Sequence, residues 1–301
     1  MNNHSTLHDD PFVAFLRSRA DATVYLKPYW GNSGDTLISL GCREVLAREG
    51  LKLSMNPERS DLILWPGGNP TMWKGNLDEW SRCWEKWPDK EFVVGPATFQ
   101  GLELPWQSML EQCGANIGGL FARDPVSHEN LLKLKLPKRI RVGLSHDPAF
   151  MLKDSLWLKE LLPSCSGEFA LAAFRSDHEG IRPFKHRLLQ RAPWPLSSLH
   201  RRIRHKKDRN RIEGLMNRVR ALSGGMPILC EDVALRSFDS FVEKVSQASV
   251  VHTDRLHTMI LGVLLGKEVI AYPTAYSKLE QVYDHSISTC QFVKFESRKA
   301  Y

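Results

Sequence analysis

The sequence has few cysteines, and their spacing forms no recognisable motif. The six residues are Cys42, Cys83, Cys113, Cys165, Cys230 and Cys290. The absence of any Cys-x-x-Cys pair argues against a zinc ribbon, and the scattered positions argue against a disulfide framework. We expect these residues to be buried, reduced thiols.

Long apolar segments are also missing. A membrane-spanning helix needs about 20 apolar residues, and the longest candidate here runs only from Met259 to Leu265. The first residues, Met1–Ser5, lack the basic and then apolar pattern of a signal peptide. We therefore expect a cytoplasmic protein.

Two common nucleotide-binding motifs are absent as well. The glycine-containing segments 31–35 (Gly-Asn-Ser-Gly-Asp) and 67–69 (Gly-Gly-Asn) resemble phosphate-binding turns. Neither continues into the Gly-Lys-Ser/Thr of a Walker loop, and neither matches Gly-x-Gly-x-x-Gly. No cluster of metal-ligating residues is evident, so we expect no metal and no cofactor.

Instead, the 301-residue chain alternates apolar, β-branched runs with segments of helical period. The expected strands are 22–26, 61–65, 91–94, 119–122, 140–144, 169–174, 227–230 and 250–251, with a closing strand within 266–273. The clearest expected helices are 36–48, 212–222 and 238–248. Such alternation predicts an α/β fold of two doubly wound, Rossmann-like domains facing a cleft.

A break in composition near Pro163–Gly167 separates the two series. We expect an N-terminal domain over 1–163, a C-terminal domain over 168–285 and a C-terminal tail over 286–301.

The net charge of +7 is concentrated in one segment. Residues 182–211, which we call the basic segment, contain eleven Lys and Arg against Asp208 alone. Their charge of +10 leaves −3 for the rest of the chain. Such a segment can bind a phosphorylated substrate, anionic lipid or nucleic acid, or it can be a solvated loop. Trp194 stands nearly alone in it, which argues against stacking on bases, and we expect no nucleic acid partner.

Three arginines mark candidate anion sites. Arg123, Arg175 and Arg255 each follow an apolar expected strand. Ligands of doubly wound folds bind at the carboxyl ends of strands, and guanidinium suits carboxylate or phosphate. The alternative is a structural role, with Asp124 or Asp177 as a pairing or capping partner.

The most informative stretch is Ser249–Ile260, in which a strand leads through Asp254 and Arg255 into an apolar helix. His257 lies on the first turn of that helix. It can act as a phosphate ligand, as a general acid, or as a buried histidine bonded to a carbonyl.

Other strand ends carry weaker signals. Asn32 and Asp35 can line an anion site at a helix start or can form a helix cap. Gly67, Gly68 and Asn69 allow close backbone approach. Asp147, in the segment His146-Asp147-Pro148, is expected to fix a loop rather than to perform chemistry.

Together these segments resemble the polysaccharide pyruvyl transferase family. The similarity spans roughly Tyr25 to Ser286 and is most specific at Asp254-Arg255-Leu256-His257. The other segments that carry it are Gly31–Asp35, Gly67-Gly68, Gly95-Pro96, Ala122–Ser127 and His146–Phe150. It departs from the family at Asn69, where a third glycine is usual, and in the basic segment.

The resemblance implies a GT-B-like fold and the transfer of an enolpyruvyl-derived group from phosphoenolpyruvate onto two sugar hydroxyls, forming a cyclic ketal. It implies that Arg255, Leu256 and His257 form the donor site in the C-terminal domain, with Arg123 as a second arginine motif. Arg175 is a further candidate donor ligand. Asn32, Asp35, Gly67, Gly68, Asn69 and Asp147 are candidates for the acceptor side or its loops.

We therefore predict a pyruvyl transferase of exopolysaccharide or cell-wall glycan biosynthesis. Its expected partners are phosphoenolpyruvate as co-substrate and a lipid-linked oligosaccharide as acceptor. The basic segment would bind anionic lipid at the inner membrane face and make the protein peripheral there. The alternatives are a GT-B-type glycosyltransferase using a nucleotide sugar and a non-catalytic glycan- or nucleic-acid-binding protein.

Overall fold

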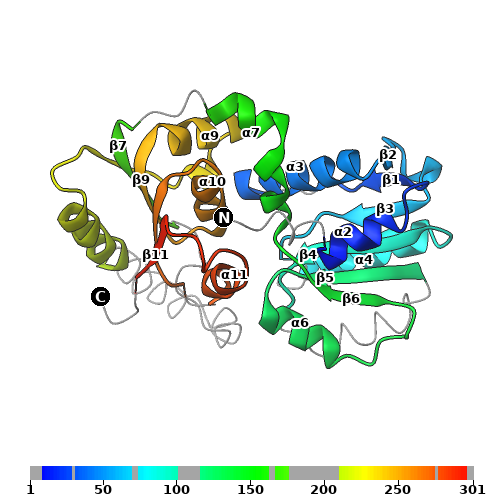
Figure 1. The fold of residues 1–301 in the computed structure, drawn as a ribbon. Coiled ribbons are helices and arrows are strands. Elements are labelled where there is room, and N and C mark those ends of the chain that lie inside the picture. The colour runs from blue at the N-terminus through cyan, green and yellow to red at the C-terminus, as the bar shows by residue number, and fades with distance from the viewer. Residues whose placement is uncertain are drawn as a thin grey trace, which may run out of the picture. The chain divides into compact units, whose positions relative to one another are not determined.

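A computed structural model describes residues 9–28, 31–69, 74–100, 116–162, 167–175, 210–274 and 277–296. The chain forms two compact units (Figure 1). The first unit contains Met1–Leu158 and Gln281–Thr289, and the second contains Lys159–Glu280 and Cys290–Tyr301.

The first unit is built on a six-stranded sheet in the order β2-β1-β3-β4-β5-β6, and every pairing in it is parallel. Its strands are β1 (Thr23–Leu26), β2 (Lys52–Leu53), β3 (Leu62–Trp65), β4 (Glu91–Ala97), β5 (Ile117–Ala122) and β6 (Arg141–Leu144). Its helices are α2 (Pro11–Arg17), α3 (Ser33–Arg48), α4 (Lys74–Lys86), α6 (Pro125–Leu132) and the short η1 (Pro57–Arg59) and η3 (Pro148–Asp154).

Both faces of this sheet are covered, as β3 shows most clearly. Successive side chains of a strand point to opposite faces, and all four residues of β3 are buried. Leu62 and Leu64 pack in a cluster with residues of α2 and α3. Ile63 and Trp65 pack on the other side with Trp80 of α4 and with residues of β4 and β5. Helices on both faces explain why the strand is a continuous apolar run.

The second unit is built on a five-stranded parallel sheet in the order β11-β10-β9-β7-β8. Its strands are β7 (Phe169–Ala173), β8 (Ile228–Cys230), β9 (Ala248–Thr253), β10 (Glu268–Ala271) and β11 (Val293–Phe295). Its helices are η8 (Val233–Leu235), α9 (Phe238–Gln247), α10 (Leu256–Leu264) and residues 210–222. Two of the boundaries between the units fall within helices. One follows Leu158 in α7 (Leu156–Leu161), and the other follows Glu280 in α11 (Lys278–Ser286).

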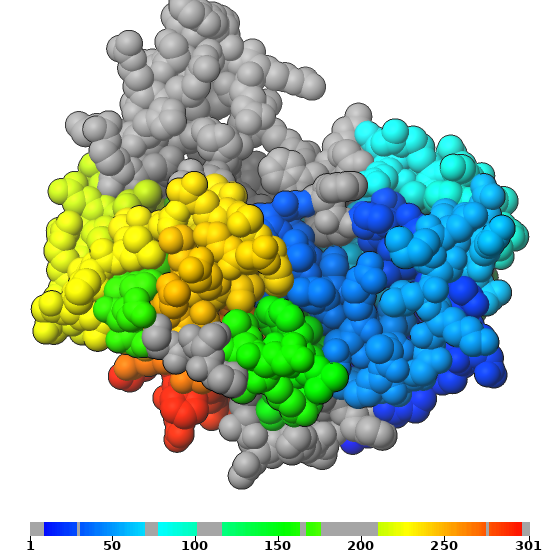
Figure 2. Space-filling view, turned by 90° about the horizontal axis from the view of Figure 1, so that it is seen from above, coloured from blue at the N-terminus to red at the C-terminus, as the bar shows by residue number. Residues whose placement is uncertain are grey.

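The helices of the second unit also cover two faces. Helix 210–222 contributes Leu215 and Val219 to a cluster with Phe174, Ile270 and Tyr272. Helices α9 and α10 contact β9 and α10 also contacts β10, and Figure 2 shows α9 (yellow) on the outer surface. Two doubly wound parallel sheets in one chain confirm the expected α/β class with two Rossmann-like domains.

Some details differ from the sequence-based expectation. The segment expected as a tail, 286–301, supplies β11, which pairs with β10, and Gln281–Thr289 belongs to the first unit. Among the four described cysteines, Cys42 and Cys290 are buried, whereas Cys230 is exposed, so its expected burial is wrong. In the described part of the chain, no helix is long and apolar enough to cross a membrane. Residues 182–209 of the basic segment lie outside the described residues.

One buried histidine of the second unit predicts how stability depends on pH. His252 is fully buried, its Nδ1 lies 2.9 Å from the Tyr272 hydroxyl, and burial lowers its pKa from 6.5 to about 4. The unfolded chain therefore binds more protons, and stability is lost as pH falls from about 6.5 towards 4. We expect a loss of about 3 kcal/mol over this window.

Urea unfolding of the wild type and of His252→Asn at several pH values measures this contribution. Asn does not titrate and can still bond to Tyr272, so the variant should lose less stability on acidification. The raised pKa of Asp10 acts in the opposite sense but is common to both proteins. Parallel pH dependences of the two proteins would contradict the prediction.

Candidate functional site

In each unit the chain order reverses across one pair of neighbouring strands. The first sheet extends from β1 to β2 on one side and to β3 on the other. The second extends from β7 to β8 on one side and to β9 on the other. Ligands of doubly wound folds bind outside the carboxyl ends of the strands at such a point. Arg175 follows β7 and Arg255 follows β9, so both lie at the reversal point of the second sheet.

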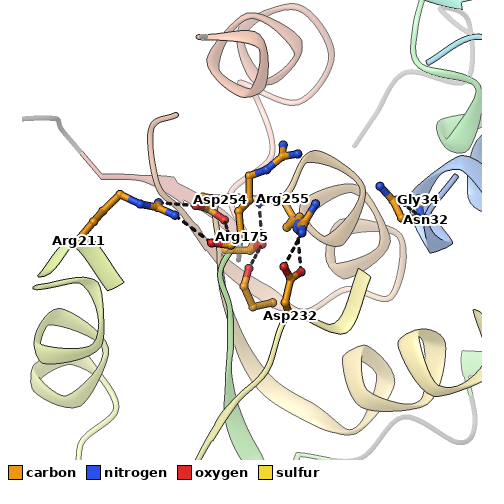
Figure 3. A network of polar contacts seen from close by, with 9 residues as sticks. Asn32, Gly34, Arg175, Arg211, Asp232, Asp254 and Arg255 are labelled. Atoms are coloured by element: carbon orange, nitrogen blue, oxygen red, sulfur yellow. Dashed lines mark hydrogen bonds and ion pairs between the residues drawn. The ribbon is translucent and has the colours of Figure 1, made fainter. Parts of the chain in front are cut away.

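Arg255 is held by a carboxylate from the neighbouring loop. Its Nε donates to Asp232 Oδ1 at 2.8 Å, and its Nη2 pairs with Asp232 Oδ2 (Figure 3). The side chains of Arg255 and Asp232 are 5% and 10% exposed. Two parallel bonds fix the plane of the guanidinium as well as its position. The Arg255 backbone N–H also donates to Thr253 Oγ1, whose hydroxyl donates to the Ala173 carbonyl.

A second carboxylate organises Arg175. Asp254 Oδ1 accepts the Arg175 backbone N–H at 2.7 Å, and Asp254 Oδ2 accepts Arg211 Nη1 at 2.6 Å. Arg211 Nη2 donates to the Arg175 carbonyl at 3.1 Å (Figure 3). We call Arg175, Arg211, Asp232, Asp254 and Arg255 the arginine cluster. The cluster brings three guanidinium groups and two carboxylates together around the ends of β7 and β9.

The residues after Arg255 lie on the first turn of α10. Leu256 is 4% exposed and belongs to the apolar core, whereas His257 is half-buried. The sequence motif therefore places one apolar anchor and one imidazole directly beside the arginine cluster in the chain. The roles of Leu256 and His257 in donor binding stay predictions.

In the first unit, Arg123 lies in a buried network at the ends of β4, β5 and β6. Its Nε donates to Thr98 Oγ1 at 2.9 Å, its Nη1 to Asp147 Oδ2 at 2.6 Å and its Nη2 to Asn69 Oδ1 at 3.2 Å. Arg123 is 1% exposed. The partner of Arg123 is Asp147; Asp124 instead caps α6 through the Ser127 N–H. Donor binding by Arg123 stays a prediction, and its observed contacts are structural.

Asp147 has a second contact that agrees with a structural role. Its other oxygen accepts the Ala149 N–H at 3.0 Å and caps η3. The Asp147 carboxylate thus joins the loop after β6 to Arg123, and fixes the loop as the sequence led us to expect.

The first turn of α3 is closed by its own side chains. Asn32 Oδ1 accepts the Gly34 N–H at 2.8 Å, and Asp35 Oδ2 accepts the Asn32 N–H at 2.9 Å. This reciprocal arrangement is a capping box. Of the two interpretations left open by the sequence, the capping role is the one with observed contacts, and acceptor binding by Asn32 and Asp35 stays a prediction.

The turn after β3 requires its glycines for backbone reasons. Gly67 and Gly68 have φ values of +137° and +86°. A Cβ on Gly67 would lie 2.5 Å from the Pro96 carbonyl oxygen. The positive φ of both residues, together with the close approach of Gly67 to Pro96, explains these glycines without a ligand.

Replacing Gly67 by alanine should therefore destabilise the protein by about 1–3 kcal/mol, because a strained backbone conformation costs this much before any clash is counted. Gly214→Ala is a matched control, since Gly214 lies within helix 210–222 and a Cβ there meets nothing within 4 Å. The control should be stabilised by about 0.5–1 kcal/mol, because alanine is favoured over glycine inside a helix. Denaturant unfolding midpoints of the two variants and the wild type show whether the two substitutions change stability in opposite directions. Equal changes in stability would contradict the prediction.

A pair of histidines lies near the end of β6. The rings of His146 and His285 stack with centroids 4.9 Å apart, and His146 Nδ1 lies 3.0 Å from Ser286 Oγ. Burial lowers the pKa of both imidazoles. Both are therefore held neutral near pH 7, and together they fix Gln281–Thr289 to the first unit.

The sequence analysis missed two members of the arginine cluster. Asp232 follows β8 in the way that Arg175 follows β7, so the same strand-end rule applied to 227–230 would have found it. Arg211 was assigned only to the basic segment, and no sequence signal links it to Asp254. Within the described ranges, no three His, Cys, Asp or Glu side chains are grouped so that they could hold a metal ion.

Comparison with known proteins places this architecture in a family. The profile of the family described as polysaccharide pyruvyl transferase matches residues 32–276. No curated protein matches at a significant level.

Among solved structures, a functionally uncharacterised protein from Klebsiella pneumoniae has a TM-score of 0.62 at 21% identity, covering 95% of this chain and 97% of its own. A UDP-GlcNAc 2-epimerase from Neisseria meningitidis has a TM-score of 0.40 at 13% identity, covering 90% and 86%. One from Methanocaldococcus jannaschii has a TM-score of 0.40 at 11% identity, covering 96% and 86%. Because the family profile covers most of the chain, the protein belongs to the polysaccharide pyruvyl transferase family.

Proposed function

We propose that this protein transfers an enolpyruvyl-derived group from phosphoenolpyruvate to two hydroxyls of one sugar in a glycan precursor, forming a pyruvate ketal. The arginine cluster is the observation that carries the proposal. It lies at the reversal point of the second sheet and within the family match. It places two arginines, Arg175 and Arg255, just after the neighbouring strands β7 and β9, and guanidinium is suited to binding carboxylate and phosphate.

The donor chemistry fits these residue types. Phosphoenolpyruvate has a carboxylate and a phosphate, and guanidinium binds either group bidentately. We assign donor binding to Arg175 and Arg255, with Asp232 fixing the plane of Arg255. Both arginines are less than 10% exposed, so their attraction to an anion is screened little by solvent.

The reaction proceeds in two bond-forming steps. A proton adds to the methylene carbon of the donor, and a sugar hydroxyl oxygen bonds to the resulting cationic C2 and loses its proton. A second hydroxyl of the same sugar then bonds to C2 and loses its proton, while the C2–O bond to phosphate breaks and phosphate leaves with that proton. The net products are the ketal and inorganic phosphate. His257 can donate the first proton or bind the leaving phosphate, since imidazole changes charge near neutral pH.

We further propose that the acceptor belongs to exopolysaccharide or cell-wall glycan synthesis and is carried on lipid. The basic segment supports this proposal by its charge of +10. Each cation near an anionic lipid surface contributes about 1 kcal/mol of attraction. The enzyme would then be peripheral at the inner membrane face.

The test is to incubate the protein with phosphoenolpyruvate and lipid-linked oligosaccharides, and to measure phosphate release together with the acceptor's mass. We expect equimolar phosphate and pyruvate ketal. Parallel reactions with nucleotide sugars and no phosphoenolpyruvate test the glycosyltransferase alternative. Release of nucleoside diphosphate, with no ketal in the first reaction, would overturn the proposal.

A further inference from the structure

We infer that Arg211, the last cation of the basic segment, is a positioning residue for the donor site, where it holds the peptide of Arg175 in place. The inference rests on the proposed function, because it assigns Arg211 to the same site. It also gives one described residue of the basic segment a role that charge alone does not explain.

The contacts of Arg211 enclose one residue from both sides. Asp254 accepts the Arg175 N–H, Arg211 pairs with the other oxygen of Asp254, and Arg211 also donates to the Arg175 carbonyl. The two backbone polar groups of Arg175 are thus both held, one directly by Arg211 and one through Asp254. Since these bonds fix the backbone, they set the direction in which the Arg175 side chain leaves the end of β7.

Burial makes this arrangement depend on Arg211. The Asp254 side chain is 0% exposed, so water does not compensate its charge, while the Arg211 side chain is 20% exposed. Among the described residues, the ion pair that Asp254 makes is with Arg211. A buried carboxylate that loses its cation must rearrange or take up a proton. Either change would release the Arg175 N–H from its present position.

Arg211 is carried by an anchored element rather than by a loop. It lies on the first turn of helix 210–222, whose Leu215 and Val219 are 2% and 0% exposed in the core of the second unit. The same helix is tied to β11 and its continuation by Arg218, which donates to Glu296. The guanidinium of Arg211 is therefore delivered to Asp254 by packed structure.

The geometry gives a kinetic signature. Arg211 acts on Arg175, a donor ligand in the proposed function, so its loss should raise KM for phosphoenolpyruvate and leave KM for the acceptor unchanged. A shift of about 1 Å in a positioned group can cost about 100-fold in rate. We expect Arg211→Gln to lower kcat/KM for phosphoenolpyruvate by about 10- to 100-fold.

Arg211→Lys separates charge from geometry. Lysine supplies one cation to Asp254 but cannot reproduce the fork that also reaches the Arg175 carbonyl. We expect it to recover part of the loss. The matched control is Arg220→Gln on the same helix, because Arg220 is exposed and bonds to Asn217. The control should keep wild-type kinetics.

The measurements are steady-state kinetics in both substrates and the unfolding midpoint of each variant. Equal kcat/KM for wild type and Arg211→Gln would overturn the inference. An equal rise of both KM values would also overturn it, because that result indicates general loss of structure.

If Arg211→Gln does not fold, the double variant Arg211→Gln/Asp254→Asn removes the uncompensated carboxylate. The folded double variant should show the same selective rise in donor KM, and an unchanged donor KM there would equally overturn the inference. A wild type without activity on phosphoenolpyruvate overturns the proposed function instead.

Discussion

Arg255→Lys is expected to lower kcat/KM for phosphoenolpyruvate by about 100- to 1,000-fold, the usual effect of losing a preorganised group that stabilises developing charge. Lysine keeps the positive charge but lacks the planar fork that Asp232 holds in two bonds. Arg255 is the N-cap residue of α10 and makes no side-chain cap bond, so the substitution leaves the capping of this helix unchanged. Steady-state kinetics with saturating acceptor measures the effect.

The control for this experiment is Arg236→Lys. Arg236 follows η8 in the same loop region and pairs with Glu231, but its side chain is 59% exposed. Exposed pairs contribute about 0–1 kcal/mol, so this variant should behave as wild type. Donor binding can also be followed as the rise in unfolding temperature caused by phosphoenolpyruvate. Arg255→Lys should lose that rise, and a variant that keeps both the rise and the rate would exclude Arg255 as a donor ligand.

The second large effect concerns the first unit. Removing one member of the Arg123–Asp147 pair, as in Asp147→Ala, should destabilise the protein by about 3–5 kcal/mol, because it leaves an uncompensated buried charge. The two side chains are 1% and 0% exposed, and Arg123 Nη1 lies 2.6 Å from Asp147 Oδ2. Urea unfolding measures the change.

Two further variants make this prediction specific. Arg123→Met/Asp147→Leu removes both charges and should be less destabilised than either single variant, since replacing a buried pair by apolar residues is often neutral. Arg48→Gln removes a partner of Glu49 from a pair whose arginine is 37% exposed, and should cost at most about 1 kcal/mol. Additive losses in the double variant would show that the pair is not coupled.

The repeating βα pattern could be predicted from the sequence because both sheets are parallel and covered on both faces. Residues 62–65 and 169–174 are continuous apolar runs, and the structure has β3 and β7 there. Helix α4 was not predicted: its buried Trp80 and Trp84 recur at helical spacing, but the many charged and polar residues between them leave no apolar run to mark the element. Strand β11 was missed because three residues, Val293–Phe295, give almost no periodic signal.

Site residues that follow a strand in the chain could be predicted from the sequence. Site residues that only tertiary packing brings to the site could not. Arg175 and Arg255 were found because each comes just past an apolar expected strand. Arg211 lies 36 residues after Arg175 in the chain, and only the packing of helix 210–222 brings its guanidinium to Asp254. At Asn32 and Asp35 the sequence pattern was recognised but its role could not be decided, because a helix cap and an anion site at a helix start share the same pattern. The structure shows a capping box there.

The first unit is built from two separate parts of the chain, and this affects how it can fold during synthesis. The first unit includes Gln281–Thr289, where His285 and Ser286 contact His146. Chains emerge from the ribosome N-terminus first, and domains generally fold as they emerge. Here the N-terminal unit can acquire its last contacts only after nearly all of the second unit has been translated. A nascent chain stopped before residue 281 would hold a partly finished first unit, with His146 lacking the ring that stacks on it.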